Sequence, residues 1–131
     1  MKSAIIVLIA MALFPYMMAW VSGFYRVKEL GKIDNKNPRQ QYTQLTGVGA
    51  RAVAAQQNCW EALAFYSAAL LAVSASGVSV DYLAETALVV LVCRTLYCIC
   101  YLANLDKFRS LLFGLGTIPY GYWFYVVIAN S

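Results

Sequence analysis

The chain has 131 residues, of which 62% are apolar and 12% are charged, and its mean hydropathy is +0.63. This composition excludes an ordinary soluble domain and is typical of a membrane protein. The net charge of +4 does not indicate a nucleic-acid partner, because the basic residues cluster where membrane topology alone would place them. We therefore expect a single integral membrane domain over residues 1–131, surrounded by the lipid bilayer.

Four windows are long and apolar enough to cross a bilayer, which takes roughly 20 helical residues. The first has no ionisable group, and Pro15 is expected to bend it. The second carries its ionisable residues in its first half, the third contains one charge that looks buried, Arg94, and the fourth contains none. In chain order, the windows are residues 4–24, 49–75, 82–104 and 110–129.

The connections between these windows predict the topology. Short connections follow the second and third spans, so we expect an all-α membrane protein with four transmembrane helices in an antiparallel bundle. The loop 25–48 is long and rich in Lys and Arg, and the third loop adds Lys107 and Arg109. The positive-inside rule places both loops in the cytoplasm and both termini outside it. The N-terminal stretch could also be a cleaved signal peptide, but its apolar run is longer than the roughly 7 to 15 residues of such a core.

Polar residues in the second and third spans are expected to form a column. At a rise of about 1.5 Å per residue, Glu61 and Arg94 both lie roughly 15 Å below the cytoplasmic surface, so we expect them to form a pair that closes the base of the column. The other members share the same helix faces, with Arg109 at the cytoplasmic mouth; they are Arg51, Asn58, Tyr97 and Tyr101. Gln56 points to nearly the opposite side of its helix, which suggests contact with another subunit.

A buried charge is costly in hydrocarbon, so the column needs an explanation. One reading is a structural clamp, in which the polar groups hydrogen-bond between helices. The column holds more donors and acceptors than a clamp needs, which favours a polar ligand. Guanidinium groups bind carboxylates, and the carboxylate of Glu61 can bind an ammonium group. A ligand that carries carboxylates and an ammonium group and enters from the cytoplasm therefore fits the column.

Other chemistry is disfavoured by the residues present. The chain contains no His, and no Ser or Cys has an adjacent base, so a nucleophilic triad is not expected. Its four cysteines fall within the spans without CxxC spacing, so we expect small packing residues and no metal site. A transporter or channel is also disfavoured, because the outer half of the bundle offers no continuous polar path.

Three stretches carry a recognisable pattern: "DNKNPR" at 34–39, "LTGVGARAVAAQQNCWEALAFY" at 45–66 and "RTLYCICYLANLDKFRSLLFGLG" at 94–116. They resemble the MAPEG family, the membrane-associated proteins in eicosanoid and glutathione metabolism, and are most similar to its small bacterial members. The resemblance implies a homotrimer that binds glutathione as a co-substrate between subunits, in a bacterial inner membrane. It also implies a glutathione transferase or peroxidase that attacks lipophilic electrophiles.

The resemblance also implies roles for individual residues. Arg109 matches the arginine that stabilises the glutathione thiolate. Arg26 and Gln56 match contacts from the neighbouring subunit, and the remaining glutathione-binding matches are Asn58, Glu61, Arg94, Tyr97 and Tyr101. Ala54 and Ala62 depart from the pattern, since catalytic members carry an Arg and a Tyr there. Arg51, one turn earlier, is a candidate substitute for the missing Arg. The alternative is a non-catalytic lipid-binding or scaffold member with a structural polar core.

Overall fold

The computed structural model describes residues 1–130, and within them the chain is helical, with no strand. The helices are α1 (Lys2–Leu30), α2 (Pro38–Tyr42), α3 (Gly47–Ser76), α4 (Leu83–Leu102) and α5 (Asp106–Ala129). All helices but the short α2 are long and apolar enough to cross a membrane. The prediction of an all-α membrane fold with four spans is therefore confirmed.

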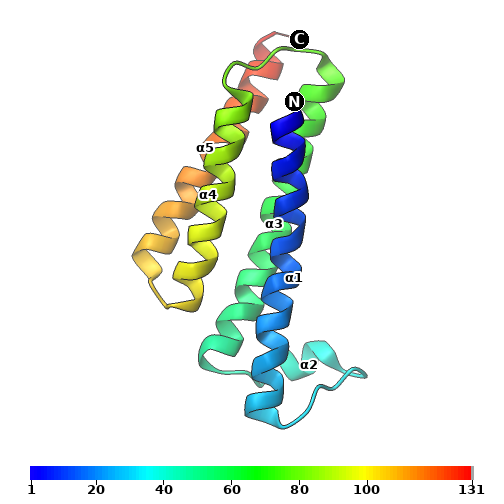
Figure 1. Ribbon diagram of the computed structural model, residues 1–131, viewed down its shortest axis with the longest axis vertical. Coiled ribbons are helices and arrows are strands. Elements are labelled where there is room, and N and C mark those ends of the chain that lie inside the picture. The colour runs from blue at the N-terminus through cyan, green and yellow to red at the C-terminus, as the bar shows by residue number, and fades with distance from the viewer. Residues whose placement is uncertain (131) are drawn as a thin grey trace.

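The four long helices lie side by side, and helices adjacent in the chain run in opposite directions (Figure 1). The chain termini and the α3–α4 connection lie at one end of the bundle, whereas α2 and the α4–α5 turn lie toward the other. Helix α1 packs mainly against α3, and α5 packs mainly against α4. As a result, both basic connections lie toward the same end, which we call the basic end.

The first loop differs from the expectation of an open connection over residues 25–48. Helix α1 continues to Leu30 and ends at Gly31, whose φ of 80° lies in the left-handed region that glycine adopts without strain. Helix α2 then begins at Pro38, a residue suited to the first turn of a helix. Hydropathy locates the edge of the lipid and not the end of the helix, so α1 can extend beyond the membrane.

Large apolar side chains cover the outer surface of the bundle. Trp20, Leu71 and Ile128 are each more than two-thirds exposed. Lipid tails are as apolar as these side chains, so helices in a bilayer associate through close packing rather than through apolar burial. Such an exposed apolar surface is what a membrane-embedded bundle requires.

The core near the termini is built around Trp123 and Tyr66, which are fully buried with ring centroids 5.2 Å apart. The polar group of each of these two side chains donates a hydrogen bond. Tyr66 Oη donates to the carbonyl of Ala4 at 2.8 Å, and Trp123 Nε1 donates to Thr86 Oγ1 at 2.9 Å. These bonds tie α3 to α1 and α5 to α4, so the termini end of the bundle is fixed by directional contacts.

A second, smaller core lies nearer the basic end. There the sulfur atoms of Cys59 on α3 and Cys98 on α4 are 3.5 Å apart, and both side chains are buried. All four cysteines of the chain are free, and the two in this core fill space between closely packed helices as small apolar side chains do.

Candidate functional site

The centre of the candidate site is a hydrogen-bonded bridge between α3 and α4. Arg94 is only 3% exposed, and its Nη1 donates to Oδ1 of Asn58 at 2.6 Å. Asn58 Nδ2 in turn donates to Oε2 of Glu61, one turn further along α3, at 3.3 Å. A neutral amide therefore connects the buried cation to the exposed carboxylate.

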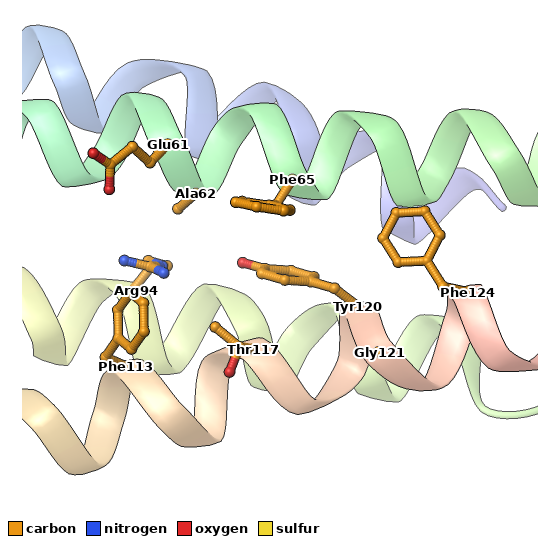
Figure 2. Close-up of a pocket in the computed structure, with 9 residues that line it drawn as sticks. All are labelled: Glu61, Ala62, Phe65, Arg94, Phe113, Thr117, Tyr120, Gly121 and Phe124. Carbon is orange, nitrogen blue, oxygen red and sulfur yellow. The ribbon is translucent and has the colours of Figure 1, made fainter.

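The expected direct pairing of Glu61 with Arg94 is corrected by this bridge. The two residues do lie opposite each other and line one cavity, as their depths predicted (Figure 2). However, the guanidinium donates to Asn58 Oδ1, and Asn58 in turn donates to the carboxylate of Glu61, so the amide stands between the two charged groups.

The remaining surroundings of Arg94 are aromatic. Its guanidinium carbon lies 5.1 Å from the ring centroid of Tyr97 and 5.5 Å from that of Phe113 on α5, which are cation–π distances. A guanidinium carries five N–H donors. One of them is bonded to Asn58, and the guanidinium also interacts with the hydroxyl of Tyr120. The other donors remain available to a ligand.

An aromatic row leads from Arg94 to the basic end. The rings of Tyr97 and Tyr101 meet edge to face with centroids 5.5 Å apart. The guanidinium of Arg109, at the start of α5, lies 4.3 Å from the centroid of Tyr101. Tyr97 is buried, whereas Tyr101 and Arg109 are half-buried. The column expected from the sequence is thus continuous from Arg94 to Arg109.

Arg51 lies on the same face of α3, nearer the basic end. Its Nε donates to the backbone carbonyl of Leu102, the last residue of α4, at 3.2 Å. A cation at a helix C-terminus interacts favourably with the last carbonyl groups and with the helix dipole. Arg51 therefore holds the end of α4 against α3, a role that the sequence pattern did not indicate.

The structure places the two remaining candidates, Arg26 and Gln56, apart from the column. Arg26 is buried; its Nε donates to Gln41 Oε1, its Nη2 donates to the carbonyl of Asp34 at 2.9 Å, and its guanidinium faces the ring of Tyr42. Gln56 lines a groove between α2 and α3 that also includes Tyr42. The two residues therefore adjoin the same small helix, α2.

A cavity of about 380 Å³ lies beside the bridge, between α3, α4 and α5 (Figure 2). Glu61 and Arg94 form its polar end, and its walls are mainly aromatic, from Phe65, Phe113, Tyr120 and Phe124. Ala62, where catalytic members of the resembled family carry a Tyr, also lines the cavity and takes up little of its space.

Sequence reasoning missed the α5 side of this cavity. A spacing of three to four residues puts Arg109, Phe113, Thr117, Tyr120 and Phe124 on one face of a helix. Within an apolar span such aromatic residues look like lipid-facing side chains, so only the position of Arg109 pointed to this face. Extending that face along α5 would have located Phe113 and Tyr120.

The chain matches one known protein family over nearly its whole length. A family model described as MAPEG family matches residues 3–129 of the chain. The matched region contains the column, the cavity and the anchored loop around α2. No significant match was found among curated proteins or among solved structures.

Proposed function

The chain belongs to the MAPEG family, and on that premise we propose that it binds glutathione beside Arg94 and activates the glutathione thiol with Arg109. Membership makes it an integral, multi-pass membrane protein of glutathione or eicosanoid metabolism. Members of this family generally use glutathione. The finer proposal is a transferase or peroxidase that combines glutathione with lipophilic electrophiles or hydroperoxides.

The observation that carries the proposal is the incompletely paired guanidinium of Arg94. A buried cation in a membrane needs anionic or hydrogen-bonding partners, yet the partners of this one are all neutral: the amide of Asn58, the hydroxyl of Tyr120 and two aromatic rings. Glutathione has two carboxylates and one ammonium group. One carboxylate suits the free N–H donors of Arg94, and the ammonium group suits the exposed carboxylate of Glu61.

The proposed chemistry takes place at Arg109. A thiol with a pKa near 8.5 is mostly protonated at neutral pH, and lowering this pKa by about two units requires about 2.7 kcal/mol of preferential thiolate stabilisation. A half-buried guanidinium can supply such stabilisation. The thiolate then forms a C–S bond with an electrophilic carbon while that carbon releases its leaving group. With a hydroperoxide the thiolate attacks the O–O bond, which releases an alcohol and leaves an S–OH group on the glutathione. A second glutathione thiol then reacts with this group to form the disulfide and water.

We also propose that the protein acts as a homotrimer. Arg26 and Gln56 lie on the α2 side of the bundle, away from the column, and Gln56 lines an open groove there. In a trimer, this side of one subunit would complete the column of the next subunit. Both basic connections lie toward one end of the bundle, which supports a cytoplasmic basic end with the termini on the opposite side. The resemblance of the sequence to small bacterial members supports a bacterial inner membrane as the location.

A second candidate function is non-catalytic binding of lipid. The mainly apolar cavity beside Arg94 favours it, because such a cavity can hold an acyl chain without any reaction. Replacing Arg109 by Ala separates the two candidates. An enzyme loses turnover with a model electrophile and keeps its fold, whereas a lipid-binding protein shows no turnover before or after the change.

The glutathione proposal is tested by thermal unfolding of the detergent-purified protein with and without millimolar glutathione. A ligand at 100 times its dissociation constant should stabilise the protein by about 2.7 kcal/mol. Glu61→Gln should abolish most of this stabilisation without unfolding the protein, since Glu61 is exposed. Gln57→Ala, an exposed neighbour on α3, is the matched control and should respond as the unaltered protein does. The absence of any glutathione effect on the unaltered protein would refute the proposal.

A further inference from the structure

Two cysteine side chains that the proposed chemistry does not use face each other between α3 and α4. The sulfur atoms of Cys59 and Cys98 are 3.5 Å apart, and these side chains are only 2% and 4% exposed. They are the one pair of cysteines in contact among residues 1–130, since Cys93 and Cys100 have no sulfur partner there. Two thiols that lie 39 residues apart in the chain are thus held within reach of each other by the fold.

The two sulfur atoms need little movement to bond. An S–S bond is about 2.05 Å long, so the sulfur atoms must approach each other by about 1.5 Å. Rotation about the Cα–Cβ bond moves each sulfur atom, and the neighbouring helix surface is narrow because Ala55, one turn before Cys59, is fully buried in the same core. Side-chain rotation together with a small shift of the helices is therefore sufficient to form a disulfide.

The surroundings of the pair combine burial with a nearby cation. Cys59 directly follows Asn58, which accepts the hydrogen bond from Arg94, and Cys98 is about one turn beyond Arg94 on α4. Burial in apolar surroundings slows attack by a sulfur atom, whereas a nearby guanidinium favours it. Bulky reagents are excluded, but a small oxidant reaches the sulfur atoms when the helices open locally. We expect oxidation over minutes to hours, within the range of disulfide formation in other proteins.

We propose that Cys59 and Cys98 form a reversible redox site, which a hydroperoxide oxidises to a disulfide between α3 and α4. One sulfur attacks the O–O bond and becomes S–OH, and its proton leaves with the alcohol, or with water if the oxidant is hydrogen peroxide. The second thiol attacks this sulfur, the S–S bond forms, and the OH group leaves with the thiol proton as water. The hydroperoxide gains two electrons and the thiol pair loses two. A dithiol reductant reverses the reaction by exchange.

The disulfide would also act on the candidate site. Its formation pulls on α3 directly after Asn58 and on α4 one turn from Arg94, and these two residues make the hydrogen bond that joins the helices. The redox state of the pair therefore adjusts the geometry of the column. Any effect on glutathione binding rests on the proposed function, whereas formation of the disulfide does not.

The test uses the full chain, purified in detergent with reductant, freed of reductant and treated with hydrogen peroxide in the absence of glutathione. The protein is then denatured, its free thiols are alkylated with iodoacetamide, and intact mass spectrometry counts the alkyl groups. We expect two alkyl groups instead of four, and a rate of loss that does not depend on protein concentration, because the bond is intramolecular. Peptide mapping should find Cys59 joined to Cys98. Dithiothreitol before alkylation should restore all four groups.

Single variants show which cysteines are needed. Cys98→Ala should keep three alkylated thiols after peroxide treatment and form no cross-link. Cys93→Ala and Cys100→Ala, the matched controls on the same helix, should form the cross-link at the unaltered rate. If Cys98→Ala does not fold, the mapped bond in the unaltered protein still decides. Four alkylated thiols in the unaltered protein, a bond between another pair, or oxidation of single sulfur atoms to acids would overturn the proposal. A Cys59–Cys98 bond in a protein that does not bind glutathione would support it and refute only the glutathione proposal.

Discussion

Nη1 of Arg94 and Oδ1 of Asn58 are 2.6 Å apart, and this hydrogen bond joins α4 to α3 inside the bundle. Asn58→Ala removes the acceptor and leaves a buried guanidinium without it. The free energy of unfolding should fall by about 1.5 to 3 kcal/mol, the usual contribution of a hydrogen bond to a charged group. Denaturant unfolding in detergent measures this loss. Gln57→Ala, in the same turn of α3 but exposed, should change stability by less than about 0.5 kcal/mol, and equal losses in both variants would contradict this role.

Arg109 is predicted to act on the reaction and not on the fold. If Arg109 holds the pKa of the glutathione thiol about two units below 8.5, Arg109→Ala returns that pKa to its ordinary value. The rising midpoint of kcat/KM against pH should then move upward by about two units, and kcat/KM at pH 7 should fall about 25-fold. Lys107→Ala removes an exposed cation from the same end of α5 and should leave the pH profile unchanged. An unmoved midpoint in Arg109→Ala would exclude thiolate stabilisation by this residue.

Gln41 is predicted to hold the basic loop in place. It is buried, accepts hydrogen bonds from Arg26 Nε and from the backbone N–H of Asp34, and donates to the carbonyl of Lys32. Gln41→Ala removes all three bonds, so trypsin should cleave after Lys32 and Lys36 at least about tenfold faster. This factor corresponds to a decrease of about 1.4 kcal/mol in the free energy of local unfolding of the loop. Gln40→Ala, an exposed neighbour, should be cleaved at the original rate. Equal cleavage of both variants would show that Gln41 does not control this loop.

The same loop should loosen in acid because of Asp34. Backbone N–H groups of Asn37 and Lys36 donate to its carboxylate and hold its pKa below the ordinary value of 3.8. A carboxyl group whose pKa is lower in the folded state stabilises that state fully above its unfolded pKa, and this contribution is lost as the pH falls through the folded pKa. Hydrogen-exchange protection of these two amides should therefore decrease below about pH 3.8. Asp34→Asn should flatten this dependence, whereas Asp81→Asn should not.

The contact between α1 and α3 depends on the absence of a side chain at Gly49. A Cβ at this position would lie 2.9 Å from Cβ of Tyr25, closer than packed atoms allow. Gly49→Ala should therefore destabilise the protein by about 1 to 3 kcal/mol through overpacking. Gly114→Ala is the control, because a Cβ there meets nothing within 4 Å and Ala favours helix over Gly by roughly 0.5 to 1 kcal/mol. A stabilised Gly49→Ala variant would show that the helices separate readily at this point.

Much of the fold follows from hydropathy and charge. The apolar windows predict the four long helices, and the loop lengths predict their antiparallel order. The end of α1 at Leu30 and the short helix α2 could not be predicted in the same way. Both lie in polar sequence, where hydropathy has no signal and the outcome depends on Gly31, Pro38 and the contacts of Arg26.

The site was predictable where it depends on depth and helical phase. These two quantities place Glu61 and Arg94 at one level and align Tyr97 and Tyr101 with Arg109. They contain no information on how side chains tilt or on which backbone carbonyls lie within reach. For this reason the amide bridge through Asn58 and the bond from Arg51 to the carbonyl of Leu102 appear only in three dimensions.

The amide between Glu61 and Arg94 also has a kinetic consequence. Since neither charge neutralises the other directly, an incoming zwitterion meets a cation and an anion that are both ready to receive it. No ion pair must first dissociate, so capture should be limited by diffusion and charge steering, and its rate constant should decline as ionic strength rises.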